Sequence, residues 1–117
     1  NTNYTLKDFP KNLEDIDWHV ISEYHNLSEK FIQKHKDEID WMNLSRYQTL
    51  SEKFIEKYKD KVDWLWISIN QNLSFSFILK MKSYVNWNII KDRYNITKDD
   101  IIKSINREES NNFTLNI

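Results

Sequence analysis

Ile39-Asp40-Trp41 is one of four copies of a short sequence that returns every 23 residues along the chain. The other copies are Ile16-Asp17-Trp18, Val62-Asp63-Trp64 and Val85-Asn86-Trp87. Self-similarity at a fixed period of this length indicates an array of small structural repeats. We therefore divide the chain into four repeats, residues 16–38, 39–61, 62–84 and 85–107.

Each repeat contains two sequences that are typical of helix starts. In the second repeat, Asp40 and Ser51 are N-cap residues, whose side-chain oxygens accept hydrogen bonds from first-turn amides. An apolar residue precedes each cap and another follows four residues after it, as in a hydrophobic staple. The same pattern in all repeats predicts helices over residues 18–25, 29–37, 41–48, 52–60, 64–71, 75–83, 87–93 and 98–106.

Helices this short are not stable alone in water, because tertiary packing supplies most helical stability. One repeat also buries too few apolar side chains to offset the ordering of its own backbone. The repeats must therefore stack on one another, which is the architecture of an α-solenoid. We expect an all-α fold, a small right-handed solenoid of stacked helix pairs with a 23-residue repeat.

The two ends of the array carry polar substitutions at repeat positions that are apolar elsewhere. Asp100 stands where the earlier repeats have phenylalanine, and Asp8 stands one period before Phe31. We expect residues 1–15 to form an N-terminal half-repeat cap and residues 16–107 to form the array. Residues 108–117 lack the repeat pattern and are expected to be a loosely attached strand or coil.

The composition is that of a soluble globular protein and excludes several kinds of site. The 117 residues are 39 % hydrophobic and 30 % charged, with a net charge of −1. The sequence has no cysteine, which excludes disulfides and thiolate metal sites, and no glycine, which excludes a glycine-rich phosphate loop. No apolar run approaches the roughly 18 residues of a membrane span, and no signal peptide is visible. We expect an intracellular protein that is not secreted.

Two stretches resemble a known group of proteins. They are Leu27 to Ile32 with Ile39 to Ser45, and Leu50 to Ile55 with Val62 to Ser68. Leu-Ser-Glu-Lys-Phe-Ile followed by Asp-x-Val-Asp-Trp-x-x-Ile-Ser is similar to short tandem-repeat proteins of giant DNA viruses, phages and AT-rich bacteria. The resemblance covers residues 16–107 and implies a viral or phage origin, in the host cytoplasm or the virion, and an interaction role. It implies no assigned activity.

The third repeat departs from the others in ways that suggest a partner-binding surface. Phe75 replaces a glutamate, Trp66 stands where Val20 and Asn43 stand earlier, and the repeat has lost most of its charge. An exposed apolar patch marks a partner surface. The alternative is that a neighbouring repeat or the C-terminal tail covers these side chains. The predicted partner-binding residues are Trp66, Phe75, Met81 and Tyr84.

Lysines recur at two repeat positions near the ends of the second helices, and a solenoid would align each set into a row. Such rows can hold phosphates, which makes a nucleic-acid-associated protein the second functional hypothesis. The other interpretation is favourable pairing with helix C-termini on a solvated face. The candidate phosphate contacts are Lys34, Lys57, Lys80 and Lys103 in one row and Lys36, Lys59 and Lys82 in the other.

No residue pattern indicates catalysis, a metal or a cofactor. The three histidines lack metal-ligand spacing, and the recurring aspartates and serines are accounted for as N-caps. The four tryptophans that open helices could stack nucleobases or sugars, but their locked period favours packing between repeats. We expect a non-catalytic module that binds another protein, in a virion or against a host factor.

Overall fold

The computed structural model describes residues 2–4 and 16–115, and the side chains of residues 16–107. The described part is mostly helical, as expected. Its elements are β1 (Thr2–Tyr4), α1 (Trp18–Tyr24), β2 (His25–Leu27), α2 (Glu29–Lys34), α3 (Trp41–Tyr47), α4 (Glu52–Lys57), α5 (Trp64–Asn70), α6 (Phe75–Lys80), α7 (Trp87–Tyr94) and α8 (Lys98–Leu115). The chain divides into two compact units, Asn1–Val85 and Asn86–Ile117.

The predicted N-caps are confirmed throughout the described helices. Asp40, for example, has an extended backbone and accepts from the amide of Asn43 at 3.1 Å. Ser51 accepts in the same way from the amide of Phe54 at 3.1 Å. The other predicted caps also accept first-turn amides: Asp17, Ser28, Asp63, Ser74, Asn86 and Thr97. These bonds are why every helix of the array begins where the sequence predicts.

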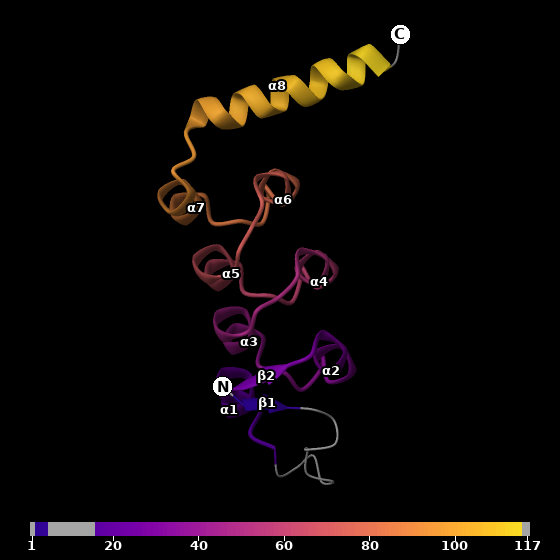
Figure 1. The fold of residues 1–117 in the computed structure, drawn as a ribbon, viewed down its shortest axis with the longest axis vertical. Helices are drawn as coiled ribbons and strands as arrows, with labels where there is room; N and C mark the ends of the chain where they lie inside the picture. The colour runs from indigo at the N-terminus through magenta and orange to yellow at the C-terminus, as the bar shows by residue number, and fades with distance from the viewer. Residues whose placement is uncertain (1, 5–15, 116–117) are drawn as a thin grey trace. The chain divides into compact units, whose positions relative to one another are not determined.

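Within the first unit, the first helices of successive repeats lie side by side. Helix α3 packs against both α1 and α5, and Figure 1 shows α2, α4 and α6 in a second column. Apart from Ile96 and Ile101 of the fourth repeat, which are half-buried, the predicted staple residues are each at most 9 % exposed. Those of the first unit are Ile16, Ile21, Leu27, Ile32, Ile39, Leu44, Leu50, Ile55, Val62, Ile67, Leu73, Ile78 and Val85.

Buried glutamines join the second repeat to the first and the third repeat to the second. Gln48, only 5 % exposed, accepts from the amide of Leu27 at 2.9 Å. Its side-chain nitrogen donates to the carbonyls of Ser22, at 2.9 Å, and His25. We call Gln48 and its equivalent, Gln71, the glutamine clamps. Gln71 makes the same three bonds one repeat later, to the amide of Leu50 and the carbonyls of Ser45 and Gln48.

A second set of bonds between repeats runs along the starts of the second helices. The carboxylate of Glu29 accepts from the amide of Ser51 at 2.8 Å and from its hydroxyl at 2.9 Å. Glu52 makes the same pair of bonds to Ser74, at 2.6 and 3.1 Å. The third repeat has Phe75 at this position, which carries no carboxylate, so the row of glutamates ends there.

The fourth repeat begins its second helix by a different device. The carboxylate of Asp100 accepts from the amide of Thr97 at 2.8 Å, while the hydroxyl of Thr97 accepts from the amide of Asp100 at 3.1 Å. This reciprocal capping box closes the start of α8 from within its own sequence. The same repeat ends α7 at Asn95, whose φ of 53° is in the left-handed region that asparagine tolerates.

Two expectations about the ends of elements need correction. Helices α2, α4 and α6 end about three residues earlier than predicted, because a tight turn follows each of them. After α2, for example, the amide of His35 bonds to the carbonyls of both Phe31 and Ile32. The segment expected to be a loose strand or coil continues α8 to Leu115, since it contains neither proline nor glycine to end the helix.

The N-terminal segment adds a strand that the sequence did not predict. Strand β1 pairs in parallel with β2, with Thr2 opposite His25 and Tyr4 opposite Leu27. Three residues are too few for a recognisable alternation of polar and apolar side chains. Residues 5–15 of the expected half-repeat cap lie outside the described residues.

Candidate interaction surface

The helix-opening tryptophans have structural roles within the array. The indole nitrogen of Trp41 donates to the carbonyl of Lys36 at 2.9 Å, and its ring packs against Phe54 and Tyr58 of its own repeat. Trp64 repeats the indole bond to Lys59 at 2.8 Å. These tryptophans therefore hold the two helices of a repeat together, and their donors are occupied by backbone carbonyls of the preceding repeat.

The four residues predicted to bind a partner do not form one patch. Met81 is 4 % exposed and is a core residue, so its assignment to a contact surface was wrong. Tyr84 is half-buried, with its ring 5.4 Å from that of Trp64. Phe75 is 38 % exposed at the start of α6, whereas the half-buried Trp66 lies on α5. Side-chain direction, which repeat position alone did not settle, separates them.

The lysine rows are largely exposed, but several members have partners within the protein. Lys80 pairs with Glu56 at 2.7 Å. The ammonium groups of Lys57 and Lys59 lie 5.6 Å from the ring centroids of Tyr58 and Tyr84. The exposed members are Lys34, Lys57, Lys80, Lys103, Lys36 and Lys82, with Lys59 half-buried. Phosphate binding by these rows stays a prediction.

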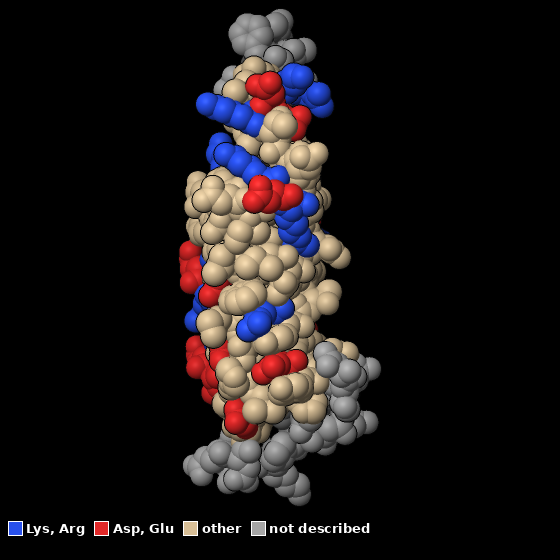
Figure 2. All heavy atoms as spheres, turned by 90° about the vertical axis from the view of Figure 1, so that its left-hand side faces the viewer, with Lys and Arg blue, Asp and Glu red and all other residues tan. Residues whose placement is uncertain are grey.

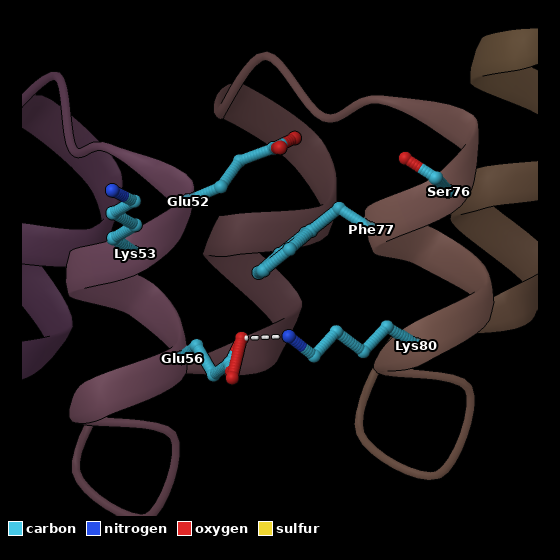
Figure 3. Close-up of a pocket in the computed structure, with 6 residues that line it drawn as sticks. All are labelled: Glu52, Lys53, Glu56, Ser76, Phe77 and Lys80. Atoms are coloured by element: carbon cyan, nitrogen blue, oxygen red, sulfur yellow. Dashed lines mark ion pairs between the residues drawn. The ribbon is translucent and has the colours of Figure 1, made fainter.

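A shallow hollow of about 260 Å³ lies between α4 and α6. Figure 3 shows the ring of Phe77 pointing between the two helices and the ion pair of Lys80 with Glu56 closing one side. Its other lining residues are Glu52, Lys53 and Ser76. Since Glu52 is bonded to Ser74 and Glu56 to Lys80, the two carboxylates serve the packing of neighbouring repeats.

The outer side of α3 and α5 exposes more apolar surface than the second helices do. Met42 is 50 % exposed, Tyr47 37 % and Leu65 45 %. With Arg46 and Trp66 they form what we call the α3–α5 face. Helix α5 carries no charged residue, and Figure 2 shows a broad uncharged area across the middle of this side of the molecule. Exposed apolar side chains gathered in this way are typical of a binding surface.

Arg46 is the charged residue of the α3–α5 face, and two aromatic rings hold it. The carbon at the centre of its guanidinium lies 4.3 Å from the ring centroid of Trp66 and 4.9 Å from that of Tyr47. These distances are those of cation–π contacts. Asn70 of α5 donates to the backbone carbonyl of Arg46 at 2.8 Å, which further joins the two helices. The sequence analysis missed Arg46, although it breaks the repeat by replacing Glu23.

At the N-terminal end of the same helix column, His19 forms an ion pair with Asp40. The two side chains are 2.9 Å apart. The hydrogen bond to Asp40 raises the pKa of His19, against the smaller opposing effect of desolvation. For Asp40, burial acts to raise the pKa, but the bonds from His19 and the amide of Asn43 outweigh it, so the pKa of Asp40 is lowered.

The replacement Asp40→Asn should lower the pKa of His19 in an NMR titration of the imidazole. Asparagine preserves the N-cap, as Asn86 does at the same position of the fourth repeat. Because the folded-state pKa of His19 is raised, its stabilising effect is present below about pH 6.5 and is lost as pH rises through the folded value. Asp63→Asn, which alters a cap that has no histidine partner, is the control; an equal shift there would contradict this assignment.

The described part of the chain shows no group of three or more histidine, aspartate or glutamate side chains placed to hold a metal ion. Among the same residues, no helix combines the length and the apolar character needed to cross a membrane. Comparison of the chain with protein-family models, with curated protein sequences and with solved structures finds no match.

Proposed function

We propose that the first three repeats form a small α-solenoid, while an array of four repeats stays a prediction. The support is the recurrence of particular bonds at the repeat period. The glutamine clamps make the same three bonds at Gln48 and Gln71, and the glutamate bonds recur at Glu29 and Glu52. The second repeat thus contacts the first in the same way as the third contacts the second, as solenoid repeats do. The right-handed stacking stays a prediction.

We propose that the protein is a non-catalytic module that binds another protein through the α3–α5 face. The observation that carries this proposal is the exposure of Met42, Tyr47 and Leu65 on the two helices that Arg46 and Trp66 join. Exposure of these apolar side chains to water does not stabilise the fold, whereas their burial against a partner would stabilise the complex. Tryptophan, tyrosine and arginine are also the residues that most often dominate binding energy at interfaces.

The proposed surface keeps Trp66 from the sequence prediction and replaces its companions. A viral or phage origin, as a virion component or as an antagonist of a host factor, is part of the proposal and is supported by the sequence resemblance alone. The stacked outer sides of helical repeats provide extended binding surfaces, which suits such a role.

Leu65→Asp should abolish partner binding and leave the fold intact. The leucine is 45 % exposed, so aspartate costs little stability, whereas a carboxylate buried in an interface without a partner group costs several kcal/mol. The measurement is affinity purification of the tagged chain from the cells that produce it, in high salt and after nuclease treatment, with thermal unfolding of each variant.

Phe75→Asp is the matched control, because Phe75 is similarly exposed but lies on the second helix of the same repeat. It should retain the partner. Loss of the partner in Phe75→Asp with retention in Leu65→Asp would move the site to the start of α6. A companion that is removed by nuclease or by salt would instead favour the lysine rows.

A further inference from the structure

We infer that the α3–α5 face takes a segment of a partner protein that presents one carboxylate among aliphatic side chains, with the carboxylate against Arg46. This inference rests on the proposed function and gives the chemistry of the partner. The α3–α5 face carries a single cation, which has no acidic partner in the described part of the chain and lies among exposed apolar groups.

The first observation is the state of the Arg46 guanidinium. Its central carbon lies over the rings of Trp66 and Tyr47, and these contacts fix the position of the group at the surface. Among the described side chains, no carboxylate lies within ion-pair distance of it, and none accepts a hydrogen bond from it. The N–H groups on its edges are therefore left to water. A planar guanidinium in this state is prepared for a carboxylate, which it can bind through two parallel hydrogen bonds.

The second observation is what surrounds the guanidinium. Met42 precedes Arg46 by one turn on α3, and Leu65 is the equivalent of Met42 on α5. At the position of Arg46, the first repeat has Glu23 and the third has Ile69, so the cation is not part of a row. An apolar partner segment would exclude water from the edges of Arg46. Because lower local polarity strengthens an ionic hydrogen bond, the partner needs a carboxylate at that place.

The same observations disfavour a nucleic acid on this face. Binding to a phosphate backbone depends on several cations that neutralise successive phosphates. The α3–α5 face offers one arginine, and the lysine rows lie on the second helices and in the turns that follow them. A carboxylate at a single defined place, with methionine, leucine and tyrosine beside it, matches a peptide segment better than a polyanion.

The test uses a random-peptide phage library selected on the full chain. We expect the enriched peptides to contain an aspartate or glutamate flanked by aliphatic residues. Arg46→Gln should weaken their binding roughly ten- to hundredfold, the range for losing a charge-assisted hydrogen bond. Amidation of the peptide acid should weaken binding to the wild-type chain equally and should add little to the effect of Arg46→Gln. Arg46→Lys keeps the charge without the planar fork. Its affinity for the peptides should lie between those of the wild-type chain and Arg46→Gln.

Two controls separate failure of this inference from failure of the proposed function. Lys57→Gln removes an exposed cation from a second helix and should leave peptide binding unchanged. Peptides that lose binding with Leu65→Asp but not with Arg46→Gln, or that lack an acid, would overturn the inference while supporting the face. Absence of any peptide sensitive to Leu65→Asp would overturn both. Binding of a labelled oligonucleotide that Arg46→Gln abolishes would also overturn the inference.

Discussion

Alanine in place of Gln71 is expected to lower the free energy of unfolding by about 3 kcal/mol or more. The side chain is 4 % exposed and makes three hydrogen bonds to the preceding repeat. Its removal leaves the amide of Leu50 and the carbonyls of Ser45 and Gln48 without these partners. Each buried polar group that loses its hydrogen bond costs about 1–3 kcal/mol, and the replacement offers no compensating contact.

The measurement is urea unfolding followed by circular dichroism, with Gln33→Ala as the matched control. Gln33 is the same residue type but is exposed on α2, so its removal should change the unfolding free energy by less than about 0.5 kcal/mol. If the two variants have the same free energy of unfolding, water replaces the hydrogen bonds of the clamp, and the repeats are held together by apolar packing alone.

Leu44→Ala is expected to lower the free energy of unfolding by about 2–5 kcal/mol, the usual cost of a cavity in a packed core. Leu44 has no exposed surface, and it belongs to α3, which packs against both α1 and α5. The cavity would therefore lie where three successive repeats meet. Its neighbours are fixed by caps and clamps on both sides, so they cannot collapse fully into the space.

Met42→Ala is the control for this variant, because Met42 is a side chain of similar size on the same helix and is 50 % exposed. It should leave stability within about 0.5 kcal/mol of the wild type. Equal losses in the two variants would mean that Met42 is covered in solution, for example by a second copy of the chain. Sedimentation of both variants at several concentrations would then reveal the association.

The candidate site shows where inference from repeat position has its limit. The sequence identified Trp66 as an exception in its repeat, and the structure places it on the α3–α5 face. It also suggested Met81, which is buried, as are its equivalents His35 and Tyr58, so the change of residue type at this position did not bring the side chain to the surface. Arg46 was not recognised, because its significance lies in two rings, Tyr47 next to it and Trp66 from the following repeat.

The sequence by itself determined the repeat period, the start of each helix in the array and the staple residues in the core of the first unit. These features depend on local chemistry, since an N-cap oxygen and a staple act within one turn of the helix that they begin. Only the tertiary structure decided the rest. The role of the glutamine clamps, the pairing of β1 with β2 and the exposure of the α3–α5 face depend on contacts across 20 or more residues. Such contacts are set by how one repeat packs on the next, and no single stretch of sequence contains both partners.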